Sequence, residues 1–229
     1  MIKRMSILTR RPDVAPEQFR EHWFGRHADL VNRLLPGVRG YVQNRWLGPG
    51  PNPLRPPGPH RVDGIVELWF DDAAAMDAAF AAPEAAELTA DARTFIDTVT
   101  TFVVEERVCI PGPRGAAKFI GVFNRRPHLT DAEFRRQWAD EHPPHVRAGV
   151  PHACRYAQAQ VIDAAHRHAL PSGSTAVDGF VEISWPSAAD MAADMQGPTI
   201  GAMRADADRF IAVISGSVIE ERVVMAPPS

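Results

Sequence analysis

The chain of 229 residues has little of what marks several common protein classes. It contains only two cysteines, and its formal net charge is −3 at pH 7. No apolar run approaches the ~20 residues that span a bilayer. The near-neutral charge gives no electrostatic basis for binding nucleic acid or an anionic membrane. The first residues lack the apolar segment of an export signal, so we expect a cytoplasmic protein with reduced cysteines.

Catalytic and cofactor motifs are also missing. The sequence has no dinucleotide-binding glycine motif, no phosphate-binding loop and no nucleophile elbow, which argues against nucleotide-dependent and serine-hydrolase chemistry. The second half holds six histidines, and His142 and His145 have a ligand-like spacing. That spacing has no counterpart in the first half and no further ligand motif accompanies it. We therefore expect no metal site.

The sequence does contain a tandem repeat: two copies of one domain match without gaps at an offset of 115 residues. The matched segments include Arg10–Pro12 with Arg125–Pro127, Phe19–His27 with Phe134–His142, and Glu105–Val108 with Glu220–Val223. The repeat predicts two domains, 1–110 and 117–229, joined by a short, proline-rich linker at 111–116.

Each copy predicts secondary structure in the order βαββαβ. Pro16 suits the first turn of a helix, and Thr130 to Glu133 forms a capping box at the same place in the second copy. The order indicates an α+β, ferredoxin-like sheet with helices on one face. In the first copy we expect strands at 3–10, 41–47, 64–70 and 99–108, and helices at 16–35, 72–80 and 84–96.

The second face of each sheet is apolar as well. Val66, Leu68 and Phe70 alternate with Ile65 and Trp69, so both faces of this strand need cover. The matching face of the other half is the natural partner, and two sheets that meet in this way close into a barrel. The loops 47–60 and 163–177 are candidates to cover the barrel mouths, or are plain connectors.

The motif residues resemble the EthD family of dimeric α+β barrel proteins. The resemblance rests on Arg-Arg-Pro, a helix with Phe-Arg-x-x-Trp-x-x-x-His, and Pro-x-x-x-x-Tyr-x-Gln, present at Arg10–Gln43 and again at Arg125–Gln158. It implies that the two ferredoxin-like repeats form an intramolecular dimeric α+β barrel, and a homodimer of the fused chain stays open. Relatives in the wider superfamily include quinol monooxygenases, polyketide cyclases, isomerases, decarboxylases, dehydratases and heme peroxidases.

Two pairs of ionisable residues are the candidates for catalysis. His27 and His142 are the histidines found at equivalent places in both copies, and a neutral imidazole can accept or donate a proton. The alternative is that each histidine caps its helix or bonds a backbone carbonyl. Glu182, like its counterpart Glu67, is expected to face the barrel interior, either as an acid or base or in an ion pair with an arginine such as Arg10 or Arg107.

The remaining site candidates are expected to bind substrate. A phenol and an amide on one strand face suit a substrate carbonyl or enolate, although a tyrosine can also simply anchor the sheet. Where the copies differ, Trp69 becomes Ser184 and Phe102 becomes Ser217, which would leave room in the second half. We therefore expect the main pocket there, around His142. The proposed substrate-binding residues are Tyr156, Gln158, Ser184, Ser217, Trp138, Tyr41, Gln43 and Trp69.

The function expected from these residues is small-molecule chemistry. We expect a small, mostly apolar aromatic or polyketide-like ligand and cofactor-independent, histidine-mediated acid–base catalysis of the cyclase, isomerase, dehydratase or decarboxylase type. A cofactor-free or heme-dependent monooxygenase, with histidine as the heme ligand, stays open. So does a non-catalytic small-molecule-binding accessory protein.

Overall fold

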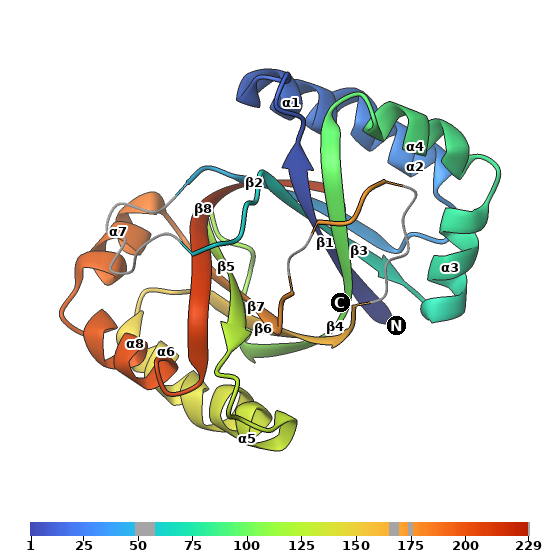
Figure 1. Cartoon of the computed structure of the whole chain (residues 1–229). Coiled ribbons are helices and arrows are strands. Elements are labelled where there is room, and N and C mark those ends of the chain that lie inside the picture. Colours follow the sequence, from blue (N-terminus) through green and yellow to red (C-terminus); the bar gives the residue numbers. More distant parts are fainter. Residues whose placement is uncertain (49–57, 165–169, 174–175, 229) are drawn as a thin grey trace.

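The computed structural model describes residues 1–48, 58–164, 170–173 and 176–228. Each half follows the order βαββαβ, with a π-helical turn (η) inside its first helical segment (Figure 1). The first half consists of β1 (Ile2–Arg10), α1 (Pro16–His22), η1 (Trp23–His27), α2 (Ala28–Leu34), β2 (Gly40–Trp46), β3 (Gly64–Phe70), α3 (Ala73–Ala81), α4 (Ala85–Ala92) and β4 (Ile96–Ile110).

The second half repeats the arrangement. It begins with β5 at Ala117, so that residues 111–116 separate it from the end of β4. Its elements are β5 (Ala117–Arg125), α5 (Asp131–Arg135), η2 (Arg136–Glu141), α6 (His142–Gly149), β6 (Arg155–Asp163), β7 (Gly179–Trp185), α7 (Ala188–Gln196), α8 (Ile200–Ala207) and β8 (Ile211–Met225).

The eight strands close into one antiparallel barrel in the order β1-β3-β2-β8-β5-β7-β6-β4. Two strands of 15 residues each, β4 and β8, join the halves. The first part of β4 pairs with β1, and its last part pairs with β6 of the other half. In the same way β8 pairs with β5 and then with β2. The expected intramolecular barrel is confirmed, with two strands shared between the repeats.

The molecule has three layers, with the barrel between two groups of helices (Figure 1). Alternate strand residues point inward, and those from both halves form one apolar cluster that includes Met5, Ile65, Phe102, Ile120 and Phe180. The other residues of each strand face the helices. Each sheet therefore has two distinct buried faces, one toward the barrel interior and one toward its own helices. No helix among the described residues is long and apolar enough to cross a membrane.

Local signals in the sequence explain where several helices begin and end. Pro16 is the first residue of α1, as expected. Thr130 caps α5, with its hydroxyl accepting from the amide of Glu133 and the Glu133 carboxylate accepting in return. Gly37 has φ of 77°, in the left-handed region that glycine tolerates, and it turns the chain from α2 toward β2.

The sequence prediction placed the end of α4 too late and made β4 too short. The helix stops at Ala92 rather than near Ile96, because Thr94 turns back to bond the carbonyl of Asp91. Ile96 already belongs to β4, which extends to Ile110.

The two loops expected over the barrel mouths are described only in part. Residues 49–57, 165–169 and 174–175, including His166 and His168, lie outside the described residues. The described parts reach the long strand of the opposite half. The backbone amide of Gly48 donates to the Ser217 hydroxyl on β8, and that of Val99 on β4 donates to the carbonyl of Pro171.

Candidate functional site

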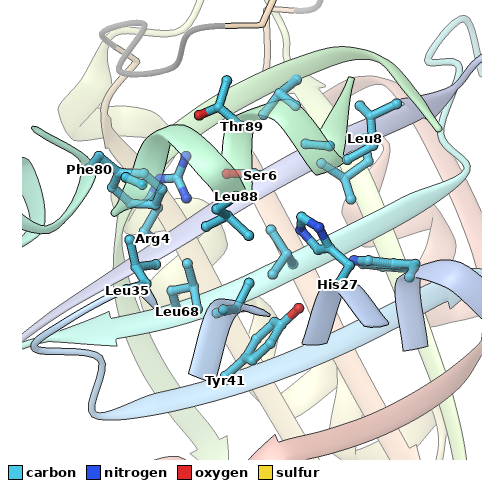
Figure 2. Close-up of a pocket in the computed structure, with 17 residues that line it drawn as sticks. Arg4, Ser6, Leu8, His27, Leu35, Tyr41, Leu68, Phe80, Leu88 and Thr89 are labelled. Carbon is cyan, nitrogen blue, oxygen red and sulfur yellow. The ribbon is translucent and has the colours of Figure 1, made fainter. Parts of the chain in front are cut away.

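A cavity of about 50 Å³ lies in the first half, between the helices and the sheet (Figure 2). Its wall includes Val66 and Leu68 of β3, which alternate with the inward-pointing Ile65 and Glu67. The cavity is therefore on the helix side of the sheet and not inside the barrel. The polar or ionisable residues in its wall are Arg4, Ser6, His27, Tyr41 and Thr89.

His27, at the end of η1, presents one ring nitrogen to an aspartate on α4. Its Nδ1 is 2.9 Å from Oδ2 of Asp91. An ionised carboxylate only accepts hydrogen bonds, so Nδ1 carries the proton and Nε2 keeps a free lone pair. Among the described residues no protein group bonds Nε2. Burial lowers the pKa of His27 below its usual 6.5, against the opposing effect of Asp91. The ring is therefore neutral at pH 7 and able to accept a proton.

Asp91 is held as a carboxylate by several donors. His22 Nε2 lies 3.0 Å from its Oδ1, and Arg26 Nε lies 3.0 Å from the same oxygen. Burial alone would raise the pKa of Asp91, but the hydrogen bonds from His27 and His22 bring it to about 2. The charge of Asp91 thus fixes the tautomer of His27 and would stabilise an imidazolium formed there.

Tyr41 supplies a hydroxyl on the same side of the cavity (Figure 2). The amide nitrogen of Gln43 donates to the Tyr41 oxygen at 2.6 Å and to the carbonyl of Trp23 at 2.7 Å. That carbonyl lies in η1, where the wider turn interrupts the regular helical hydrogen bonds. Because the phenol oxygen accepts from Gln43, its own proton is left to donate. Burial raises the pKa of Tyr41, which keeps that proton in place at neutral pH.

The second half repeats the same contacts. His142 Nδ1 is 2.7 Å from Oδ2 of Asp206, and burial lowers the pKa of His142 as well. Gln158 donates to the Tyr156 hydroxyl at 2.8 Å and to the Trp138 carbonyl at 2.6 Å. The tyrosine and glutamine singled out in the sequence thus contact each other in both halves, and in the first half His27 and Tyr41 line the same cavity. Each histidine bonds an aspartate, instead of capping a helix or bonding a backbone carbonyl.

The cavity that His27 and Tyr41 line is in the first half, whereas the differences between the two copies had placed the main pocket in the second half, around His142. Larger side chains occupy the corresponding positions of the second half. A Cβ added at Gly121 would lie 2.8 Å from Ile214, and one at Gly149 would lie 2.5 Å from Met203, so neighbouring side chains fill this space. The replacements, first half to second, are Leu8 to Phe123, Ala85 to Ile200, Leu88 to Met203 and Val99 to Ile214.

The sequence differences used for that expectation lie on the other face of the sheet. Trp69 is inside the barrel, with Lys3 Nζ 5.0 Å from its ring centroid, and Phe102 packs against Phe180 at 5.6 Å. Ser217, the counterpart of Phe102, is also buried and bonds the backbone of Gly48. A loop thus takes up volume that the aromatic ring leaves. The structure does not bring Trp69, Ser184 or Ser217 together with either histidine.

Glu182 faces the barrel interior as expected, but its partners are lysines. Lys3 and Lys118 each lie 2.8 Å from its carboxylate, and both also contact Glu67. Burial and the Glu67 charge would raise the pKa of Glu182, yet Lys118, Lys3 and Arg114 lower it. A carboxylate held ionised in this way has no proton to donate at neutral pH, and with its pKa lowered and both lysines bonded to it, it is a weak base. The geometry therefore does not support the acid–base role expected for Glu182.

The arginines expected to pair with these glutamates are engaged elsewhere. Arg10 lies 3.2 Å from Asp63, and Arg107 lies 2.9 Å from Asp140. The expectation of Arg10 or Arg107 as the partner was therefore wrong. Lys3 and Lys118 are a matched pair at the 115-residue offset, and each points inward from the strand that begins its half.

Three carboxylates inside the barrel are close enough together to hold a cation. Glu67, Glu106 and Glu182 have oxygens within 4.8 Å of one another. Lys3 Nζ already lies 2.5–2.8 Å from all three. The ammonium group occupies the position that a metal ion would need, so Lys3 and the three glutamates form an ion-pair network.

The sequence prediction missed the two aspartates that orient the histidines. Asp91 and Asp206 are related by the same 115-residue offset, and both are flanked by alanines. The repeat carried this signal, but an aspartate on an alanine-rich helix looks like an ordinary surface residue. Only the fold shows that it is buried against His27 or His142.

Sequence comparison identifies the repeated unit directly. The EthD domain matches residues 11–99 and again residues 126–213, which together make up more than half of the chain. The chain belongs to the EthD family. No curated protein matches this EthD protein.

Solved structures share the fold of this EthD protein over nearly its whole length. An anthrone oxidase-like protein is 12% identical with a TM-score of 0.66, covering 100% of this chain and 96% of its own. A candidate monooxygenase from Fusobacterium nucleatum is 8% identical with a TM-score of 0.60 (97% and 92%). Another from Lactobacillus acidophilus NCFM is 12% identical with a TM-score of 0.52 (99% and 96%). At these identities the likeness shows the fold alone.

Heme, which some members of the superfamily carry, does not fit the described cavity. Pockets for molecules of drug size measure roughly 300–1,000 Å³, against about 50 Å³ here. The Nδ1 atoms of His27 and His142 are bonded to aspartates, and the apolar walls lie close to each ring. The expectation that the protein works without a cofactor remains a prediction.

Proposed function

We propose that this EthD protein binds a small, mostly apolar, ring-containing or polyketide-like molecule in the first-half cavity, and that His27 removes a proton from it without a cofactor. The observation that carries the proposal is the state of His27. It is neutral, it is held by Asp91 at Nδ1, and it lines a cavity with no protein group among the described residues bonded to Nε2. These are the properties of a general base.

The chemistry suits a carbon acid next to a carbonyl, or a phenol. Nε2 of His27 would accept the proton, and the charge of Asp91 would stabilise the resulting imidazolium. The Tyr41 hydroxyl would donate to the enolate oxygen as negative charge develops there. Return of the proton at another atom gives isomerisation. Loss of a β-hydroxyl group, which leaves as water with the proton held by His27, gives dehydration. Attack of the enolate carbon on a second carbonyl, whose oxygen takes that proton, gives cyclisation.

Ligand entry requires the cavity to widen. A cavity of roughly 150 Å³ binds a single benzene ring, about three times the volume found here. The outer wall is formed by α3 and α4, which contribute Phe80, Leu88 and Thr89 among other residues. Two buried residues, Met76 and Ala79, anchor α3. Because α3 buries fewer residues than α2 or α4, we expect an outward movement of α3 to admit a ring.

A cofactor-free monooxygenase is the second candidate. Several proteins that share the fold are described as monooxygenases or as anthrone oxidase-like. Deprotonation of a hydroquinone or anthrone by His27 would yield an electron-rich anion that reacts with dioxygen. The two candidates share the first step and differ in what consumes the anion. Oxygen uptake with a hydroquinone that depends on His27 would favour the monooxygenase.

The test compares equivalent histidines in the two halves. The probe is methyl phenylpyruvate, a neutral ring compound with an acidic CH₂ beside a carbonyl, and proton NMR in D₂O follows deuterium exchange at that CH₂. Replacement of a general base costs about 10²- to 10⁴-fold in rate. We expect His27→Gln to lose the enzymatic exchange by about this factor and His142→Gln to retain most of it.

The two variants are matched because each loses one hydrogen bond to an aspartate. Exchange lost in His142→Gln and kept in His27→Gln would move the site to the second half. Binding of the ester without exchange would identify a binding protein instead of an enzyme.

A further inference from the structure

We propose that Arg4, Ser6 and Thr101 form an anion-binding subsite at the end of the cavity away from His27, and that the natural ligand carries a carboxylate there. The inference rests on the proposed function, because it assigns the substrate class of the same cavity. It narrows the ligand from a mostly apolar ring compound to an organic acid with an ionisable C–H or O–H at its other end.

The three residues form a connected polar group on two neighbouring strands. Arg4 and Ser6 lie on β1 and line the cavity, and Thr101 lies beneath them on β4. The Arg4 guanidinium donates to the Thr101 hydroxyl at 3.0 Å, and the Ser6 and Thr101 hydroxyls are 3.1 Å apart. The Arg4 guanidinium also lies 4.1 Å from the ring centroid of Phe80 on α3. All three polar residues are at most 3% exposed.

The second half shows that the fold does not need these polar side chains. Arg4, Ser6 and Thr101 correspond to Phe119, Gly121 and Gly216. A Cβ added at Gly216 would lie 2.2 Å from the Phe119 ring, so the ring occupies that space. The second half thus fills the equivalent place in its sheet with an apolar side chain. All three polar residues occur together in the half with the described cavity, and all three are replaced where the corresponding space is filled.

The chemistry of the group selects an oxyanion. A buried guanidinium costs free energy because it gives up its water, and a phenylalanine at this position would avoid that cost. Arginine presents several N–H donors in one plane, a geometry that matches a carboxylate. One of the two hydroxyl protons is used in the bond between Ser6 and Thr101, which leaves one further donor for the ligand.

The subsite and the base are separated along the strand. Arg4 pairs with Leu68, and Leu8 pairs with Gly64, against which the Trp23 ring packs. Four residues of strand correspond to ~13 Å. Figure 2 shows Arg4 beside Phe80 at one end of the cavity and His27 at the other. A ligand that reaches both ends would place its carboxylate at Arg4 and its acidic proton near His27.

The experiment compares 4-(2-oxopropyl)benzoate, whose carboxylate and acidic CH₂ lie at opposite ends of the ring, with its methyl ester, which removes the charge and keeps the ring and the ketone. Dissociation constants from calorimetry and deuterium exchange by NMR are measured for the wild type, Arg4→Met, Arg4→Lys and Phe119→Met. We expect the wild type and Phe119→Met to bind the acid about 10-fold or more tightly than the ester. The preference should fall to near unity in Arg4→Met and be partly kept in Arg4→Lys.

The outcomes separate this inference from the proposed function. Equal binding of acid and ester by the wild type, or an unchanged preference in Arg4→Met, overturns the anion subsite and leaves His27 catalysis standing. Acid-selective binding that depends on Arg4, without any exchange, supports the subsite and rejects catalysis. Failure of both compounds to bind at millimolar concentration overturns both proposals. If Arg4→Met does not fold, Arg4→Phe takes its place, since the second half carries phenylalanine there.

Discussion

At the scale of single residues, the chain holds two copies of one histidine–aspartate pair in different surroundings. His27 and His142 are both buried, and each bonds an aspartate through Nδ1. Burial lowers the pKa of both imidazoles. The neighbours differ, since His22 bonds Asp91 while the residue equivalent to His22 is Gln137. The described cavity opens beside His27. The histidine motif alone therefore does not specify a site, because the side chains around it decide whether a ligand can reach Nε2.

The depressed pKa of His27 predicts how activity depends on pH. Protonation of Nε2 removes the base, so exchange of methyl phenylpyruvate should be constant above pH 6.5 and decline at lower pH, with a midpoint below 6.5. The ester does not titrate in this range, so the profile reports on the protein. Asp91 favours the charged ring, so Asp91→Asn should move the midpoint lower still and reduce the plateau rate. A midpoint above 6.5 would contradict the assignment of His27 as the base.

At the scale of elements, the π-helical turn and the strand after its helix, β2 or β6, position the side chains of the site. In each half the turn leaves a tryptophan carbonyl to accept from the strand glutamine, which in turn holds the tyrosine hydroxyl. These contacts tie the helix that carries the histidine to the sheet that carries the tyrosine. The outer wall of the cavity is less firmly attached, because α3 buries only Met76 and Ala79.

This difference predicts where the protein moves when it binds. Amide hydrogen exchange should be faster in α3 than in β4, whose amides are bonded to β1 on one side and β6 on the other. Addition of 4-(2-oxopropyl)benzoate should slow exchange in α3 and α4 and leave exchange in α7 and α8, the equivalent helices of the second half, unchanged. Equal protection of both helix pairs by the ligand would show that the second half binds it as well.

The sequence predicted the elements better than it predicted the site. Strand alternation, the proline and capping signals and the repeat gave the βαββαβ order and the barrel, because these depend on local chemistry and on the need to cover two apolar faces. It also singled out His27, Tyr41 and Gln43. It could not predict the location of the cavity, because small differences at many positions, such as Leu88 against Met203, decide it together.

The burial of charge was equally hard to anticipate from sequence. Lys3 and Arg4 stand beside each other at the start of the chain and look like an ordinary basic N-terminus. In the structure Lys3 points into the barrel and Arg4 into the cavity wall, because neighbouring residues of a strand face opposite ways. The partners of Lys3 include Glu182, which is 179 residues away.

At the scale of the whole molecule, neither half is complete without the other. The last part of β4 pairs only across the boundary with β6, and the last part of β8 pairs with β2. The ion-pair network crosses the same boundary, since Lys3 bonds Glu182 and Lys118 bonds Glu67. The linker at 111–116 joins halves that are already held together by two strand pairings and a shared core.

Cutting the linker should therefore leave the barrel assembled. A protease site inserted between Gly112 and Pro113 would allow the folded protein to be nicked. We expect the nicked protein to elute at the same volume as the uncut chain in gel filtration and to keep its exchange activity. The reason is that the strand pairings between the halves do not depend on the cut peptide bond. Separation of the fragments without denaturant would show that the linker itself holds the halves together.

The 115-residue duplication within one chain has a consequence for evolution and for engineering. In a barrel assembled from two identical chains, one codon change alters both binding sites. In this gene the codon for Arg4 is separate from that for Phe119. The first half can therefore adapt to its ligand while selection on the second half acts on packing alone. The same independence would let an engineer carve a second pocket by exchanging Phe119, Ile200 and Met203 for their first-half counterparts, one codon at a time. A single polypeptide would then carry two separately tunable sites.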